Sequence, residues 1–190
     1  MGGFFGAVSH RDVTLDVFFG TDYHSHLGTK RAGMVFKDPE GGFQRQIHSI
    51  ENTPFRTRFE NDLNSFHGHS GIGCISDTDP QPLVFRSRLG VFAIAIVGHI
   101  ANQDELVDRF CKEGTQFAAM GSGAVNTVEL TAALINTKDD LIEGIKFAQE
   151  VISGSVTLVL MMEDGSLIAA RDRMGRIPIL IGKDTEGEGY

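Results

Sequence analysis

Histidines are the most conspicuous candidates for metal or acid–base chemistry in this sequence. They form two alternating pairs, His24 with His26 and His67 with His69. If a pair lies on a strand, both of its rings project to the same face, as two metal ligands would. A metal site and a group of polar side chains beside a pocket are both compatible with this spacing.

The two cysteines, Cys74 and Cys111, allow one further kind of chemistry. They are too few for a disulfide framework or a four-cysteine zinc site, and a chain without an export signal normally keeps its thiols reduced. Cys74 would be a nucleophile if His69 or His99 served as its base. Reactivity requires a lowered thiol pKa, which a sequence does not reveal. Cys111 falls on the apolar side of a predicted helix, so we expect it in the core.

The bulk composition excludes several classes of function. The 190 residues are enough for one sizeable domain, and 41% apolar and 22% charged residues are ordinary for a globular protein. No apolar run approaches the ~20 residues of a membrane helix, and the start of the chain lacks the regions of a secretion signal. A net charge of −8 disfavours nucleic acid, which requires clustered Lys and Arg. We expect a cytoplasmic domain of residues 1–190 with no membrane, nucleic-acid or cofactor partner.

The elements that must position these residues include several strands. Short apolar runs rich in β-branched and aromatic residues, bounded by Gly, Pro or Asp, predict strands. The run at 91–97 has no polar interruption, which is typical of a strand covered on both faces. Asp-Gly between two apolar runs predicts a hairpin turn at 163–166. The predicted strands are 4–8, the hairpin 33–36 and 43–47, 91–97, the hairpin 156–162 and 167–170, and finally 179–181.

Helical patterns lie mostly in the middle of the chain. Asp12 and Asn126 are candidate N-caps for two of them. In the last helix, apolar residues at 141, 142, 145 and 148 are expected to share one face. The predicted helices are 12–19, 55–63, 102–112, 127–135 and 139–151. Strands at both ends with helices gathered between them indicate an α+β domain in which helices pack on antiparallel sheet.

Five short motifs, in order along nearly the whole chain, resemble those of one family. No single motif is specific, but five motifs in this order over the full length of the chain are specific for one family. Residues 1–6 are similar to Met-Cys-Gly-Ile-Phe-Gly, 25–33 to Gln-His-Arg-Gly-Gln-Glu-Ser-Ala-Gly, 68–72 with 81–82 to Gly-His-Val-Arg-Tyr followed by Gln-Pro, 97–106 to Asn-Gly-Asn-Leu-Thr-Asn…Glu-Leu, and 171–179 to Arg-Asp-Pro-Leu-Gly-Ile-Arg-Pro-Leu.

These motifs resemble the class II glutamine amidotransferases, and most of all the N-terminal glutaminase domain of the amidophosphoribosyltransferases of purine biosynthesis. The resemblance implies an N-terminal nucleophile hydrolase fold, a four-layer αββα sandwich with two mainly antiparallel sheets between helical layers. It also implies that residues 1–190 are the N-terminal part of a longer protein, with a phosphoribosyltransferase domain beyond Tyr190. The family has histidines at the positions of His26 and His69, which favours the pocket interpretation of the histidine pairs and predicts no metal.

In that family a cysteine exposed by removal of Met attacks the side-chain amide of glutamine, and its own α-amino group moves the proton. An α-amine has a pKa near ~8, so it is a usable base at neutral pH. Here Gly2 occupies the cysteine position. Gly2 retains the amine but has no nucleophilic atom, so the thioester step cannot occur there.

Other positions that the resemblance assigns to glutamine recognition have also changed. The asparagine that stabilises the oxyanion corresponds to Val97, whereas its backbone partner Gly98 is retained and is followed by His99. Gly71 corresponds to the arginine that binds the glutamine carboxylate, and Asn126 corresponds to the acidic residue that binds its amino group. Leu27 corresponds to the arginine of the His-Arg-Gly motif. The expected catalytic set is therefore empty, and a vestigial pocket is predicted at Leu27, Gly71, Gly98, His99 and Asn126.

We therefore expect a glutamine amidotransferase-like domain that does not hydrolyse glutamine. Two alternatives stay open. The domain could bind a different small molecule or a partner and regulate a downstream phosphoribosyltransferase-like domain, or it could be an enzyme of altered chemistry that uses Cys74. The sequence does not decide whether the chain forms a homo-oligomer.

Overall fold

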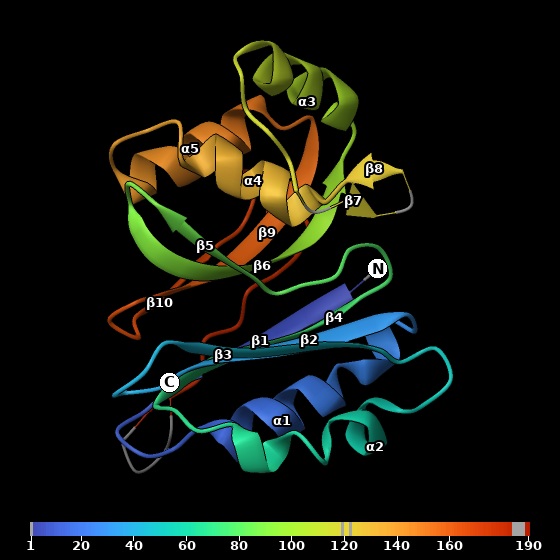
Figure 1. The fold of residues 1–190 in the computed structure, drawn as a ribbon, viewed down its shortest axis with the longest axis vertical. Coiled ribbons are helices and arrows are strands. Elements are labelled where there is room, and N and C mark those ends of the chain that lie inside the picture. The colour runs from blue at the N-terminus through green and yellow to red at the C-terminus, as the bar shows by residue number, and fades with distance from the viewer. Residues whose placement is uncertain (1, 119, 122, 184–188) are drawn as a thin grey trace.

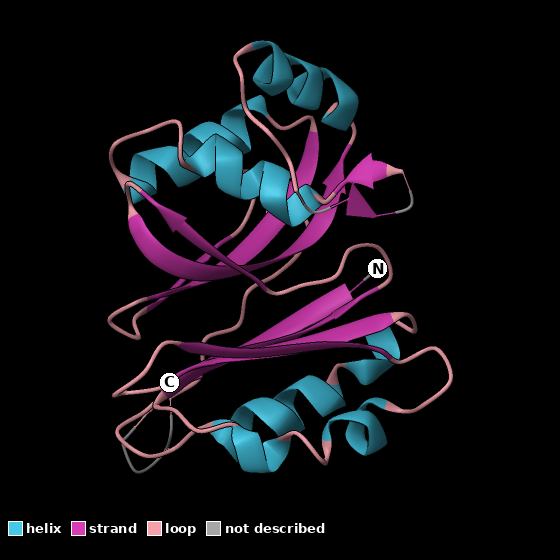
Figure 2. Ribbon diagram, viewed as in Figure 1, coloured by secondary structure: helices cyan, strands magenta, loops and turns pink. Residues whose placement is uncertain are grey.

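A computed structural model describes residues 2–118, 120–121, 123–183 and 189–190 of the chain. Two four-stranded antiparallel sheets face each other, and helices cover the outer face of each sheet (Figure 1). Coloured by secondary structure, the molecule shows both sheets inside and the helices outside (Figure 2). This is the α+β sandwich that the sequence predicts. Within the described part of the chain, no helix is long and apolar enough to cross a membrane.

The first sheet has the order β1-β4-β2-β3. Strand β1 runs from Gly2–Val8, and the predicted hairpin is formed by β2 (Arg31–Lys37) and β3 (Phe43–Ser49). Strand β4 (Ser70–Ser76) pairs with both β1 and β2, so it is central and completely buried. Strand β4 is not among the predicted strands, because the glycines at 71 and 73 weaken its strand pattern.

The second sheet has the order β10-β9-β6-β5. Its centre is formed by β6 (Gly90–Ile100) and β9 (Gly154–Met162), which are the longest strands of the fold. Strand β10 (Leu167–Ala170) completes the predicted hairpin, and β5 (Leu83–Ser87) forms the opposite edge. A small hairpin of β7 (Met120–Gly121) and β8 (Ala124–Val125) lies outside this sheet.

Helix α1 (Thr14–Tyr23) and the short α2 (Phe55–Phe59) cover the first sheet, together with the 3-10 turns η1 (Ser25–Leu27) and η2 (Leu63–Ser65). Helices α3 (Gln103–Lys112), α4 (Thr127–Ile135) and α5 (Leu141–Val151) lie on the other side of the molecule, over the second sheet (Figure 1). Gly144 of α5 lies so close to the backbone of Ile135 that a side chain there would collide with it. This glycine therefore allows α5 to pack closely on α4.

Three apolar clusters hold these layers together. One lies between the second sheet and α3, α4 and α5, and another between the first sheet and α1 and α2. The third fills the space between the two sheets with small side chains such as Cys74 and Ala93 and larger ones such as Ile72 and Met161. Because strand side chains alternate between faces, β1 contributes Phe4 to the inter-sheet cluster and Phe5 to the cluster under α1.

Several local predictions are wrong. Residues 179–181 form no strand, because no described strand lies beside them to supply hydrogen bonds, and Leu180 and Ile181 are exposed. The helix predicted at 55–63 breaks after Phe59, and the helix predicted at 12–19 begins at Thr14 and continues to Tyr23. Asp12 accepts a hydrogen bond from the Thr14 amide at 2.9 Å, although Val13 is the N-cap position.

Two side-chain placements also differ from expectation. Ile142 is 47% exposed, because the buried face of α5 follows residues 141, 144, 145 and 148 and position 142 lies one helical step away from it. Cys111 is exposed rather than buried, since the inner face of α3 is made by Leu106 and Phe110.

Candidate functional site

The site expected from the sequence begins at the amino-terminal end of β1. Gly2 pairs with Ser76, the last residue of β4. A side-chain carbon added at Gly2 would collide with the backbone carbonyl oxygen of Ile75. The position of the expected nucleophile therefore holds a residue without a side chain, in a backbone arrangement that leaves no room for one.

Leu27 lies beside this strand end. Its amide donates a hydrogen bond to the His24 carbonyl at 2.9 Å, which closes the η1 turn. Its Cδ1 atom is 2.7 Å from the point where Gly3 would carry a Cβ atom. An aliphatic side chain thus packs directly against the β1 backbone at the position where the resemblance places an arginine.

Val97, Gly98 and His99 follow one another near the end of β6, which faces β1 across the inter-sheet layer. Gly98 has a φ of 154° and pairs with Val156, and any side chain there would collide with the Ser155 carbonyl oxygen. Only glycine fits this position. Val97 is half-buried, whereas Gly98 and His99 are exposed. Val97 has an aliphatic side chain and offers no hydrogen bond to an oxyanion.

The structure does not bring Gly71 into this group. Gly71 pairs with Ala7 and Phe36, and a side chain there would enter the core at 2.6 Å from the Phe36 ring and 3.0 Å from Val17. It lies at the opposite end of β4 from Ser76, about 17 Å away at the usual rise per residue. The assignment of the carboxylate-binding arginine to Gly71 is therefore wrong.

Ser76 is the β4 residue that lies opposite Gly2. Moving the family motif Gly-His-Val-Arg-Tyr five positions along the chain matches its glycine to Gly73, its histidine to Cys74 and its arginine to Ser76. Ser76 is buried, and its hydroxyl lies 3.4 Å from the Thr78 hydroxyl. Glycines at both 68 and 73 allowed both registers. In either register the arginine is absent, and serine cannot form the two parallel hydrogen bonds that a guanidinium makes to a carboxylate.

Asn126 is a structural cap. Its Oδ1 atom accepts a hydrogen bond from the Val128 amide at 2.8 Å, as predicted for the N-cap of α4. Its Nδ2 atom donates to the Pro80 carbonyl at 3.0 Å, and the residue is 1% exposed. Both ends of the amide are therefore used inside the protein.

The segment 77–82 crosses from the first sheet to the second and curls around the amino-terminal end in the view of Figure 1. The Thr29 amide donates a hydrogen bond to Asp77 at 2.7 Å, which lowers the pKa of that carboxyl group. Asp79 accepts hydrogen bonds from the Thr127 amide at 3.2 Å and from its hydroxyl at 2.5 Å. The segment is thus anchored at Asp77 and at Asp79 beside the candidate site.

The histidine pairs do not lie on strands. His24 follows α1, with its Nδ1 atom 2.7 Å from the Gly20 carbonyl oxygen, and His26 lies in η1. His67 and His69 precede β4, and the Nε2 atom of His67 is 2.9 Å from an Asp38 carboxylate oxygen. Across the described residues, no cluster of three or more His, Cys, Asp and Glu side chains has a geometry suited to a metal ion.

Cys74 is fully buried between the sheets, where it pairs with Phe4 of β1 and Gly33 of β2. Burial without a charged partner disfavours the thiolate and raises the pKa of Cys74 far above its usual value. A thiol that remains protonated and inaccessible is a poor nucleophile.

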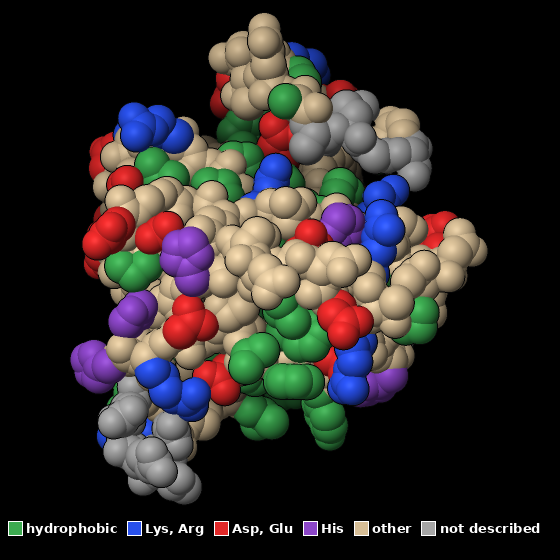
Figure 3. Space-filling model, turned by 60° about the horizontal axis from the view of Figure 1, so that its bottom comes forward, with side chains coloured by type: hydrophobic (Ala, Val, Ile, Leu, Met, Phe, Trp, Pro, Cys, Tyr) green, Lys and Arg blue, Asp and Glu red, His purple; other side chains and the backbone are tan. Residues whose placement is uncertain are grey.

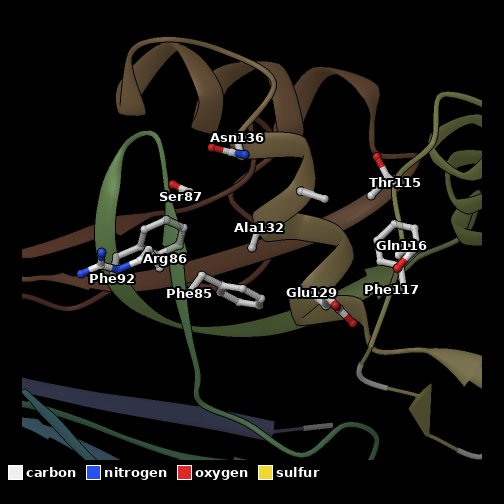
Figure 4. A pocket seen from close by; sticks show the side chains of 11 residues that line it. Phe85, Arg86, Ser87, Phe92, Thr115, Gln116, Phe117, Glu129, Ala132 and Asn136 are labelled. Carbon is white, nitrogen blue, oxygen red and sulfur yellow. The ribbon is translucent and has the colours of Figure 1, made fainter.

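A cavity of about 150 Å³ lies elsewhere, between β5, β6, α4 and the segment after α3. Figure 4 shows Phe85 and Phe92 on the sheet side, Ala132 on α4, and Phe117 on the segment opposite. The Ala118 amide holds that segment to Glu129 of α4 with a hydrogen bond of 2.9 Å. None of the residues expected in the vestigial pocket lines this cavity.

Comparisons with known proteins relate this chain to one family. A family profile described as "Glutamine amidotransferase domain" matches residues 69–190. The amidophosphoribosyltransferase of Methanocaldococcus jannaschii is 32% identical over 196 residues, covering 97% of this chain and 40% of the relative. That of Escherichia coli is 22% identical, covering 96% of this chain and 39% of the relative. A solved glutamine phosphoribosylpyrophosphate amidotransferase from B. subtilis superposes with a TM-score of 0.75 at 25% identity, covering 90% of this chain and 37% of that protein.

The two facing sheets between helical layers, with β1 at the amino terminus, define an N-terminal nucleophile hydrolase fold. The chain belongs to the glutamine amidotransferase domain family, as a class II domain similar to the glutaminase domain of the phosphoribosylpyrophosphate amidotransferases. It spans about two fifths of the length of the curated relatives that match nearly all of it.

Proposed function

We propose that this domain has the glutaminase fold but does not hydrolyse glutamine. The observation that carries this proposal is position 2, where Gly2 supplies no nucleophile and the Ile75 carbonyl oxygen occupies the space that a side chain would need. Restoring a cysteine would therefore require β1 to move relative to β4, in addition to the exchange of one residue.

The surrounding side chains support the same conclusion. The oxyanion position is Val97, and the loss of one oxyanion donor typically lowers a rate by about 10²–10³. Ser76 stands where an arginine would bind the glutamine carboxylate, and Leu27 packs its aliphatic chain beside β1. The carboxamide of Asn126 is used to cap α4. Glutamine therefore lacks partners for its carboxylate and its amino group as well as a nucleophile for its amide.

Glutamine hydrolysis by the purified chain tests the proposal. We expect neither the wild-type protein nor Gly2→Cys to release glutamate above the rate without enzyme, after mass spectrometry has shown that Met1 is removed. Gly42→Cys is a matched control, because its site is open and far from the β1 end. Wild-type hydrolysis that disappears in Ser76→Leu would contradict the proposal. Restored activity in Gly2→Cys would show that only the nucleophile has been lost.

An enzyme of altered chemistry using Cys74 is not favoured, because that thiol is buried and its pKa is raised by desolvation. A glutamine-like electrophile that labelled Cys74 stoichiometrically in the folded protein would reverse this judgement.

A ligand-sensing role is a second candidate, and the cavity of about 150 Å³ favours it. The phenylalanines at 85, 92 and 117 would suit one aromatic ring, so we expect a compound of that kind to raise the melting temperature. Ala132→Leu would fill the cavity and abolish the shift. In a longer protein of the amidophosphoribosyltransferase type, such a domain would regulate a phosphoribosyltransferase-like partner that takes ammonia from solution.

A screen of amino acids, nucleotides and simple aromatic compounds by thermal shift tests this second role. A shift that Ala132→Leu leaves unchanged would place the ligand elsewhere, and no shift from any compound would count against ligand sensing.

A further inference from the structure

Apolar side chains are uncovered in two different settings. The outer face of α1 exposes Leu15, Phe19 and Tyr23, and hydrophobic side chains gather on this side of the molecule in Figure 3. The cavity between the second sheet and α4 is also largely apolar, but one of the side chains that line it has a polar atom without a partner. That atom specifies part of a ligand, which an exposed helix face does not.

The polar side chain belongs to Asn136, at the carboxyl end of α4. The backbone of Asn136 is fixed, because its amide donates a hydrogen bond to the Ala132 carbonyl at 2.9 Å and its carbonyl accepts one from the Arg88 guanidinium at 2.8 Å. Its side-chain Oδ1 atom is buried and has no hydrogen-bond partner among the described residues. A buried oxygen left unpaired is costly in a folded protein, so a group that donates a hydrogen bond belongs beside it.

The walls of the cavity favour a flat apolar molecule. The rings of Phe85 and Phe92 lie on the sheet side, and the ring of Phe117 lies on the segment opposite (Figure 4). Phenylalanine rings pack favourably against another aromatic ring. A single water needs about 10–15 Å³ of such space, so a cavity of about 150 Å³ has room for a small ring compound.

The charges around the cavity disfavour an anion. The Glu129 side chain lines the cavity, and its carboxylate accepts a hydrogen bond from the Ala118 amide at 2.9 Å. Arg86 does not offset this charge inside the cavity. Along β5, Val84 faces the other sheet and Phe85 faces the helices, so Arg86 projects away from the helices, and Figure 4 shows it extending away from α4. Since like charges repel strongly away from bulk water, a neutral ligand is favoured over an acid.

We propose that this cavity binds a neutral aromatic molecule that carries a hydroxyl or N–H group, and that this group donates a hydrogen bond to Oδ1 of Asn136. This ligand class rests on the ligand-sensing role described above. The phenylalanines hold the ring, Asn136 fixes its orientation, and Glu129 excludes acids. Apolar walls with a few well-placed polar groups are typical of small-molecule sites.

Phenol and toluene test the hydrogen bond, because they differ only by a hydroxyl in place of a methyl group. NMR titration of the isotope-labelled chain measures both affinities and identifies the residues that contact the ring. The ratio of phenol affinity to toluene affinity is expected to be about tenfold higher in the wild type than in Asn136→Leu. Asn64→Leu makes the same exchange at an exposed position of η2 and is expected to keep the wild-type ratio. Benzoate is expected not to bind.

The outcomes separate the ligand class from the sensing role. Equal ratios in the wild type and Asn136→Leu would overturn the hydrogen bond while an aromatic site remained. Benzoate binding as tight as that of phenol would overturn the neutral class. If neither phenol nor toluene binds, or if Ala132→Leu leaves their binding unchanged, the ligand-sensing role of this cavity fails, and the ligand class fails with it.

The stability of the ligand-free protein is an independent test. Because Oδ1 of Asn136 has no partner, Asn136→Leu is expected to keep or raise the melting temperature, whereas Asn126→Ala breaks two hydrogen bonds and is expected to lower it. Circular dichroism establishes that each variant is folded. A clearly lower melting temperature for Asn136→Leu would show that its amide is already satisfied within the protein, and this result would overturn the proposal.

Discussion

At the residue scale, two glycines near the candidate site have opposite meanings. Gly98 adopts a φ of 154° against the Ser155 carbonyl, so the fold itself requires glycine there. Gly2 occupies the position that the proposal of a lost nucleophile concerns, and the Ile75 carbonyl oxygen lies where a side chain would begin. The backbone of the fold therefore explains Gly98, whereas the meaning of Gly2 depends on the proposed loss of glutaminase activity. A motif comparison alone treats both simply as glycines.

The two thiols provide a prediction at the same scale. In the folded protein at mildly alkaline pH, a thiol reagent should modify Cys111 and leave Cys74 unmodified, because only Cys111 is exposed. The raised pKa of Cys74 also keeps it protonated when an ordinary thiol, with a pKa of 9.0, would ionise. Reagent titration should therefore count one reactive thiol per chain before unfolding and a second one after it.

The variant Cys111→Ser is the control, because it should show no rapid reaction in the folded state. Rapid modification of Cys74 in that variant would contradict the buried placement, and it would reopen the alternative in which this thiol performs catalysis.

At the scale of secondary structure, a glutamine side chain extends the second sheet. Strand β5 pairs with β6 only as far as Leu83 and Ile94. Further along β6, Gln81 donates from Nε2 to the Ile96 carbonyl at 3.0 Å and accepts from the Ile96 amide at 2.8 Å. Its amide takes the place of a strand backbone, and it ties the segment beside the candidate site to the central strand. The amide and carbonyl of Ile96 are buried, so they need Gln81 as their hydrogen-bond partner.

Gln81→Met keeps the side-chain volume and removes both hydrogen bonds. Leaving a buried donor and acceptor unsatisfied costs about 1–3 kcal/mol for each group, so we expect a loss of about 2–4 kcal/mol in the free energy of unfolding. Urea denaturation measures it. Gln46→Met on the exposed side of β3 makes the same exchange and should change stability by less than about 0.5 kcal/mol. Equal effects in the two variants would show that the bonds to Ile96 contribute little.

The caps of α4 and α5 offer a second comparison. Asn126→Ala removes the bond to the Val128 amide and also the buried bond to Pro80, and it should cost about 2–3 kcal/mol. Asp140→Ala removes only an exposed cap, the bond to the Glu143 amide, and should cost about 1 kcal/mol. In urea denaturation, Asn126→Ala should have a lower midpoint than Asp140→Ala, and the slope of the unfolding free energy against urea concentration should be the same for both. If Asn126→Ala cost no more than Asp140→Ala, the link to Pro80 would have no role in stability.

The sequence predicted those helices, strands and turns that are determined by their own residues. The Asn126 cap, the Asp-Gly turn of the β9–β10 hairpin and the apolar run of β6 are of this kind. Predictions were wrong where structure depends on distant partners. Residues 179–181 have strand character but no described neighbour to pair with, and β4 is a strand only because β1 and β2 enclose it. The wrong placement of Gly71 has the same origin, since only the pairing of β4 with β1 distinguishes it from Ser76.

At the scale of the whole molecule, the fold consists of two sheet-and-helix halves whose sheets face each other. Each half has its own core under its helices, and a third apolar cluster lies between the sheets. Aspartates organise several turns and connections of the molecule. Asp38 binds the Glu40 amide in the β2–β3 turn, Asp77 binds the Thr29 amide, and Asp164 binds the hydroxyl and amide of Ser166.

These turns predict how stability depends on pH. The hydrogen bonds lower the pKa of Asp38, Asp77 and Asp164 from an ordinary value of 3.8, because they stabilise the ionised carboxylate in the folded state only. A folded-state pKa below the unfolded one means that the stabilisation is present above about pH 4 and is lost as pH falls through the folded-state values. The free energy of unfolding should therefore fall increasingly steeply below about pH 4.

Asp164→Asn keeps an acceptor oxygen but cannot titrate, so its stability should fall less steeply than that of the wild type in this range. Asp108→Asn on the exposed side of α3 removes one surface charge and should retain the wild-type dependence. Parallel curves for the wild type and Asp164→Asn would show that this carboxylate is not stabilised by its turn.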